Sequence, residues 1–142
     1  MTCCFFGHRD TPYCVENRLR DCLERLIAVE GARRFYIGNE GAFDRMAYRV
    51  LRVLREKYPS ISYSVVLAYI DSRTEAPWQD TVFPDELENV PPRFAIDRRN
   101  RWMIAHSHKA VVYVISPAGG AAKYSAIAQR RGVQVINLAP KQ

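Results

Sequence analysis

The chain has 142 residues, of which 48% are hydrophobic, and a formal charge of +6 at neutral pH. This length suffices for one ordinary hydrophobic core and is short for two, so we expect a single domain over residues 1–142. The sequence holds no run of about 18 apolar residues and starts without a basic segment ahead of an apolar one, which argues against a membrane span and a secretory signal and favours a cytoplasmic protein.

The cysteines do not form a metal-binding pattern. Cys3, Cys4, Cys14 and Cys22 include no CxxC pair and have no histidine at a ligand spacing. Cys3 and Cys4 are neighbours in an apolar run and would point to opposite faces of a strand. We therefore expect reduced structural thiols and no metal ion.

The first third of the chain reads as a strand, a turn and a helix. The apolar run Cys3–Phe6 ends at Gly7, and Asp10-Thr11-Pro12 is typical of a helix start, with a side-chain cap followed by proline. Apolar residues then recur at helical spacing until Gly31 ends the helix: Val15, Leu19, Cys22, Leu23, Leu26 and Ile27.

A second strand over Phe35–Ile37 leads through a glycine turn into the clearest helix of the chain. Its predicted inner face carries Phe43, Met46, Ala47, Val50, Leu51 and Leu54, arginines cover much of the other face, and Tyr58-Pro59 ends it. A third strand is predicted from Tyr63 to Ile70, because a nearly continuous apolar run is typical of a strand covered on both faces.

Residues 71–93 have no sustained period and contain Pro77, Pro84, Pro91 and Pro92. We interpret them as a long loop with one short helix. Loops of this length in a compact domain are often lids or binding loops, and a surface excursion is the alternative. Trp78 and Phe83 indicate that part of the loop docks on the protein.

The last part of the chain alternates again between the two kinds of element. We predict a helix over Phe94–His108, a strand over Ala110–Ile115, a helix from Gly119-Gly120 through Arg131, and a strand over Val133–Leu138. The alternation predicts an α/β protein with a doubly wound, mainly parallel five-stranded sheet and helices on both faces.

Three of the predicted strands stop at glycine-bearing turns, and this shared layout predicts a binding site. The carboxyl ends of parallel strands lie along one edge of a sheet, where open α/β folds bind ligands and helix N-termini offer free N–H groups to anions. Arginine predominates among the basic residues, and it favours bidentate contacts to phosphate. We expect a small ligand that carries phosphate.

The candidate ligand-binding residues lie in the three turns and on the helix after the long loop. They are Gly7, His8 and Arg9; Gly38, Asn39, Glu40 and Gly41; Ser116, Gly119, Gly120 and Lys123; and Arg99 and Asn100. Glycines permit close approach of the backbone to a ligand, and Arg9 is placed to form a bidentate contact with a phosphate. Asn39 and Glu40 are expected to be within reach of ribose hydroxyls. Glu40, Asp44 and His8 are weak candidates for acid or base catalysis, and each has an ordinary structural interpretation.

Four segments together resemble the small bacterial YpsA-like proteins of the SLOG superfamily, which also includes the DprA/Smf and LOG proteins. They are the opening Cys3–Arg9, the turn Gly38–Asp44, the stretch Arg99–Ile104 and Gly119-Gly120-Ala121. The resemblance implies a Rossmann-like fold that binds a nucleotide or nucleotide-derived ligand, with Gly7, Arg9, Gly38, Gly41, Gly119, Gly120 and Asn100 lining the pocket.

One departure from the LOG proteins bears on activity. Their glycine turn is followed shortly by a catalytic glutamate, whereas here Ala121–Ala126 contains no carboxylate. Ligand binding or sensing is therefore the leading hypothesis. A nucleotide N-glycosidase using Glu40 or Asp44 and a DprA-like binder of single-stranded nucleic acid are the alternatives, and a homodimer is compatible with such a fold. The sequence names no cofactor.

Overall fold

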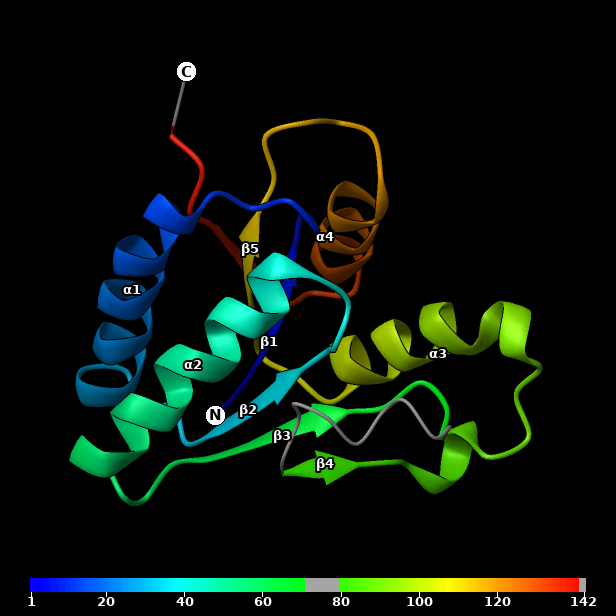
Figure 1. The fold of residues 1–142 in the computed structure, drawn as a ribbon, viewed down its shortest axis with the longest axis horizontal. Helices are drawn as coiled ribbons and strands as arrows, with labels where there is room; N and C mark the ends of the chain where they lie inside the picture. Colours follow the sequence, from blue (N-terminus) through cyan, green and yellow to red (C-terminus); the bar gives the residue numbers. More distant parts are fainter. Residues whose placement is uncertain (71–79, 141–142) are drawn as a thin grey trace.

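The computed structural model describes residues 1–70 and 80–140, whose strands form one six-stranded sheet with the order β4-β3-β2-β1-β5-β6 (Figure 1). Every strand pair is parallel. The strands are β1 (Thr2–Gly7), β2 (Arg34–Ile37), β3 (Ser62–Val66), β4 (Thr81–Val82), β5 (Lys109–Tyr113) and β6 (Gln134–Asn137). The doubly wound α/β class is confirmed, and the sheet has one strand more than the sequence pattern predicted.

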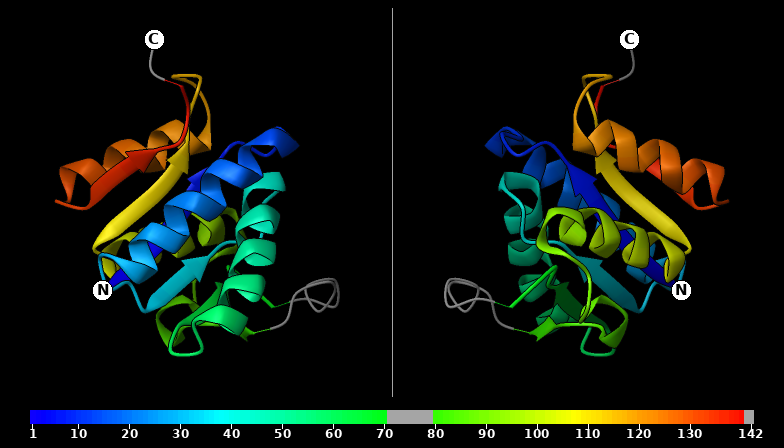
Figure 2. Two further views of the ribbon diagram at one scale, coloured as in Figure 1. Left: turned by 90° about the vertical axis from the view of Figure 1, so that its left-hand side faces the viewer. Right: turned by 90° about the vertical axis from the view of Figure 1, so that its right-hand side faces the viewer.

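The helices cover the two faces of the sheet in pairs, as the two views in Figure 2 show. Helices α1 (Glu16–Ala28) and α2 (Ala42–Lys57) pack on one face, and α3 (Pro92–Ala105) and α4 (Gly120–Arg130) on the other. The predicted inner face of α2 is buried throughout. Two short 3-10 helices, η1 (Tyr13–Val15) and η2 (Asp85–Leu87), precede α1 and α3. Among the described residues, no helix has both the length and the apolar character needed to cross a membrane.

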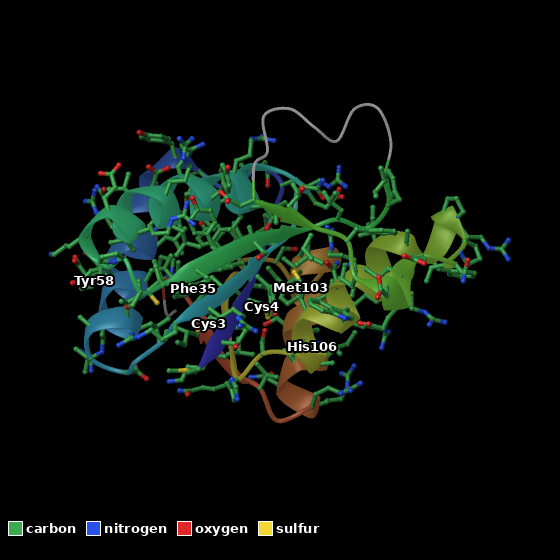
Figure 3. All side chains as sticks on the ribbon, turned by 90° about the horizontal axis from the view of Figure 1, so that it is seen from below. Cys3, Cys4, Phe35, Tyr58, Met103 and His106 are labelled. Atoms are coloured by element: carbon green, nitrogen blue, oxygen red, sulfur yellow. The ribbon has the colours of Figure 1, made fainter. Side chains whose placement is uncertain are left out.

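Adjacent residues of β1 supply the two apolar cores, one on each face. Cys3 belongs to the core under α1 and α2, which also holds Phe35, and Cys4 belongs to the core under α3 and α4, which also holds Met103 (Figure 3). Burial raises the pKa of both thiols to about 12, so they stay protonated at neutral pH. Both cysteines are free, as expected for structural thiols.

The predicted cap before the first helix is wrong. No side chain caps η1 or α1, and the hydroxyl of Thr11 instead donates to the carbonyl of His8 at 2.6 Å. The threonine therefore closes the turn that follows β1. Here a local side-chain to backbone bond competes with helix capping, a common alternative for threonine.

Several predicted boundaries move by a few residues. Strand β3 ends at Val66, and Tyr69 and Ile70 are exposed rather than covered. Helix α3 begins earlier than predicted, at Pro92, because the fixed φ of proline suits the first turn of a helix. Strand β5 ends at Tyr113, one residue after its ladder with β6 stops at Val112, and the side chain of Asn137 accepts from the N–H of Val114.

The predicted loop over residues 71–93 is in part regular structure. Thr81–Val82 form the edge strand β4, which pairs with Val65 and Val66. A two-residue exposed strand leaves no periodic signal in a sequence, which explains why the pattern missed it. Phe83 packs against the core under α1 and α2, whereas Trp78 lies outside the described residues.

The strand register brings the three glycine turns to one edge of the sheet. Gly7 at the end of β1 pairs with Tyr113 of β5, and Ile37 at the end of β2 pairs with Val65 of β3. From β1 the chain proceeds outward through β2, β3 and β4 and then returns to the other side of β1 for β5 and β6. The boundary between β1 and β5 is thus the switch point of the sheet, where open α/β proteins bind their ligands.

Candidate ligand-binding pocket

A pocket of about 320 Å³ lies at the carboxyl end of β1, between α3, α4 and the start of α2. Its volume is at the lower end of the range for small-molecule sites. Nine residues singled out from the sequence line it: Gly7, His8, Arg9, Glu40, Asp44, Arg99, Asn100, Gly119 and Gly120. Five other candidates, Gly38, Asn39, Gly41, Ser116 and Lys123, do not line it.

The turn after β1 forms the floor of the pocket. A Cβ built on Gly7 would lie 2.1 Å from the ring of Phe43, so this glycine makes room for α2 to pack against the strand. The N–H of Ile115 donates to Nε2 of His8 at 3.0 Å. This bond links the end of β1 to the segment after β5. It is the kind of contact expected if His8 has a structural role.

Glu40 is held between two arginines that come from different elements. Nη2 of Arg9 lies 3.1 Å from Oε2 of Glu40, and Nη2 of Arg99 lies 3.6 Å from Oε1. The side chain of Arg9 is 76% exposed, whereas that of Arg99 is 1% exposed. The exposed pair costs little to break because solvent screens it, so Arg9 is free to turn toward a ligand.

Arg99 is a buried anchor for the turn that follows β2. Its Nε donates to Oδ1 of Asn100 at 2.7 Å, and its Nη1 donates at 3.0 Å both to Oδ1 of Asn39 and to the carbonyl of Val66. Burial lowers the pKa of Arg99, and the carboxylates of Asp44 and Glu40 oppose that shift. With its donors engaged by the protein, Arg99 positions other side chains rather than reaching a ligand.

Asp44 is the second carboxyl group of the pocket. Its Oδ2 accepts the N–H of Glu40 at 2.9 Å. Burial raises the pKa of Asp44 to about 6, and the Arg99 guanidinium and the N–H of Glu40 oppose this rise. Its carboxyl group therefore takes up a proton more readily than an exposed aspartate does.

The N-terminus of α4 opens on the pocket. Gly119, the residue before the helix, has φ +95 and no side-chain bond caps the first turn. A Cβ on Gly120 would have Tyr124 as its nearest neighbour, at 3.9 Å, so the space beside this residue is open. Free N–H groups at such a terminus attract anions.

Two predicted residues near this helix are engaged outside the pocket. The hydroxyl of Ser116 accepts from the N–H of Ala118 at 3.2 Å, closing the turn before the helix. Nζ of Lys123 lies 3.4 Å from Oδ1 of Asp97 on α3. Lys123 therefore contributes to the contact between α3 and α4.

Close packing explains why glycines occupy the second turn. A Cβ on Gly38 would lie 2.9 Å from Oδ2 of Asp44, and one on Gly41, which has φ +127, would lie 2.7 Å from Cα of Arg9. These glycines let the first two turns approach each other. They shape the pocket without lining it.

Sequence reasoning missed the apolar wall of the pocket. Phe6, Met103 and Tyr124 line it, and the rings of Phe6 and Tyr124 stack with centroids 5.6 Å apart. The hydroxyl of Tyr124 donates to Oδ1 of Asp97 at 2.8 Å. The available signal was helical spacing, because Tyr124 follows Gly120 by four residues and thus lies on the same helix face. None of the described residues 80–93 lines the pocket, so the lid interpretation gains no support from them.

Fold and pocket together define a Rossmann-like parallel α/β protein with a pocket at its switch point. No family model and no curated protein matches the chain. Among solved structures, it is similar to DNA processing protein A from Helicobacter pylori, a protein that binds single-stranded DNA, with a TM-score of 0.68 and 16% identity. The match covers 100% of this chain and 66% of that one, slightly less than two thirds, and at this identity it establishes likeness of fold.

Proposed function

We propose that this protein binds a nucleotide or a nucleotide-derived phosphorylated ligand in the pocket at the carboxyl end of β1, as a binding or sensing module of YpsA-like SLOG type. The observation that carries the proposal is that the uncapped N-terminus of α4 and the exposed guanidinium of Arg9 face one pocket. Backbone N–H groups at a helix start together with an arginine form a phosphate site.

The rest of the pocket suits the other parts of such a ligand. Phe6, Met103 and Tyr124 offer an apolar and aromatic wall for a base. Glu40 and Asn100 offer polar groups for a sugar, since a carboxylate held by two arginines keeps lone pairs for further hydrogen bonds.

A thermal shift screen tests the proposal. The protein is melted with nucleoside monophosphates, ADP-ribose and sugar phosphates, with the matching nucleosides and free sugars as controls. A ligand that binds only the folded state raises Tm, by an amount that grows with its concentration above Kd. Stabilisation by phosphorylated compounds and not by their dephosphorylated forms supports the proposal, and equal effects of both contradict it.

Arg9→Ala is expected to weaken binding of a phosphorylated ligand about tenfold to hundredfold, the range for one charged hydrogen bond. The fold should persist because the Arg9 side chain is exposed. Isothermal titration calorimetry measures the affinity. Arg49→Ala is the matched control, because Arg49 also forms an exposed pair with a glutamate, Glu16, and does not line the pocket. Unchanged affinity in Arg9→Ala removes Arg9 from the site.

We expect no efficient hydrolysis of nucleoside monophosphates to base and ribose phosphate. Glycosidic cleavage needs carboxyl groups that stabilise positive charge on the sugar and manage water. Glu40 is paired with two arginines and the turn before α4 adds no acid. Chromatography after incubation with AMP, CMP and their deoxy forms measures base release, and release that Glu40→Gln abolishes would establish the enzyme alternative.

Single-stranded nucleic acid is the second candidate ligand. The similarity of fold to a protein that binds single-stranded DNA and the formal charge of +6 favour it. Phosphate contacts release counterions, so this candidate predicts affinity for an oligonucleotide that falls steeply with salt. Fluorescence anisotropy of a labelled oligonucleotide over a salt series measures this, and absence of binding at low salt rejects the candidate.

A further inference from the structure

Asp44 forms no direct ion pair among the described residues, although the nearby Arg99 guanidinium favours its ionised form. The pocket's ion pairs among the described residues go to Glu40, from Arg9 and Arg99, whereas Asp44 accepts its hydrogen bond from the backbone N–H of Glu40. Asp44 nevertheless lines the pocket, in the first turn of α2. A ligand anion would therefore occupy the same pocket as this carboxyl group.

The charged groups around Asp44 carry a net positive charge. Arg99 faces it from α3, Glu40 faces it from the turn after β2, and Arg45 follows it on α2. Arg9 reaches the same group of charges from the turn after β1 through Glu40. The three guanidiniums of Arg9, Arg45 and Arg99 exceed the two carboxylates of Glu40 and Asp44 by one charge, and a proton on Asp44 raises this positive excess to two.

The remaining ionisable groups that line the pocket belong to other parts of its wall. His8 is tied to the segment after β5 through its Nε2, Asp10 follows the turn after β1, and the hydroxyl of Tyr124 is bonded to Asp97. In the group of charges around Asp44, the backbone N–H of Glu40 donates to the Asp44 carboxyl group, so both acidic residues belong to one turn.

We propose that the pocket takes up its anionic ligand together with a proton on Asp44, so that binding tightens as the pH falls from the neutral range. The inference rests on the proposed function and specifies how that site is regulated. Burial already raises the pKa of Asp44 to about 6. An anion beside the carboxyl group raises it further, because a second negative charge disfavours ionisation. By linkage, the protonated form then binds the anion more tightly.

Asp44→Asn tests the inference because it imitates the protonated carboxyl group. The amide oxygen can still accept the N–H of Glu40, which preserves the turn. Calorimetry with AMP compares the variant with the wild type at about pH 5.5 and about pH 7.5; the phosphate of AMP has its own ionisation at about pH 6, which is common to both proteins. Asp21→Asn, an exposed aspartate on α1, is the control for the change in net charge.

At about pH 7.5 the variant is expected to bind AMP about tenfold more tightly than the wild type, and at about pH 5.5 the two should converge, since a shift of one pKa unit corresponds to a tenfold change. Asp21→Asn should follow the wild type. Calorimetry in two buffers of different ionisation enthalpy should show more proton uptake by the wild type than by Asp44→Asn. Parallel pH profiles of the two proteins, with binding intact, overturn the inference and leave the proposed function standing.

Two further outcomes are decisive. If neither protein binds AMP, ADP-ribose or inorganic sulfate, the proposed function and the inference both fail. If Asp44→Asn does not fold, the wild type is titrated with inorganic sulfate, whose charge is constant over this pH range. Sulfate affinity that does not rise as the pH falls overturns the inference.

Discussion

Arg99→Met is expected to lower the free energy of unfolding by about 3–5 kcal/mol, the usual cost of removing one partner from a buried ionic network. Methionine fills much of the volume but donates no hydrogen bond. The substitution leaves the carbonyl of Val66 and the side-chain oxygens of Asn39 and Asn100 without the donor that now satisfies them. Glu40 also loses its buried counter-charge.

Urea unfolding followed by circular dichroism measures this effect. Arg98→Met is the matched control, because Arg98 is the exposed neighbour on the same helix and should change stability by no more than about 0.5 kcal/mol. Arg99→Lys should restore little, since an ammonium lacks the planar fork that reaches several acceptors at once. Equal stability of Arg99→Met and Arg98→Met would show that the buried guanidinium is not an anchor.

Gly120→Val is expected to weaken binding of a phosphorylated ligand by about a hundredfold or more while the protein still folds. The valine side chain would occupy the open space at the N-terminus of α4, and an anion displaced from that position loses charged hydrogen bonds worth about 1.5–3 kcal/mol each. Folding should persist because the nearest atom to a Cβ at this position lies 3.9 Å away. Gly119 is unsuitable for the same test, since its φ of +95 strains any other residue.

Calorimetry with the best ligand of the thermal shift screen measures the loss, and the melting curve of the free protein reports on the fold. Ala122→Val is the control, because it adds a similar volume to the first turn of α4 at a residue that does not line the pocket. Unchanged affinity in folded Gly120→Val would place the anion elsewhere. A variant that fails to fold would show that the glycine serves backbone geometry.

The amino-acid sequence by itself determined the fold class and the edge of the sheet where the pocket lies. The apolar face of α2 reads directly from helical spacing, and all six of its predicted inner residues are buried. The turns at Gly7, Gly38 and Gly119 could be located because each follows an apolar run and precedes a helix. The carboxyl ends of parallel strands must share one edge of the sheet. Local sequence patterns therefore sufficed to predict the edge where the pocket lies.

Only the tertiary structure decided what the individual residues at that edge do. In the sequence, Arg99 is one of several arginines in a basic helix. In the structure it is buried against Asn39, Glu40 and Val66, and it anchors the turn after β2. The sequence suggests that Gly7 leaves room for a ligand. In the structure, the space beside Gly7 is occupied by the ring of Phe43. Asp44 reads as a helix-dipole residue, yet burial raises its pKa to about 6. These roles depend on contacts between residues far apart in the chain, and burial and charge pairing arise only when the turns come together.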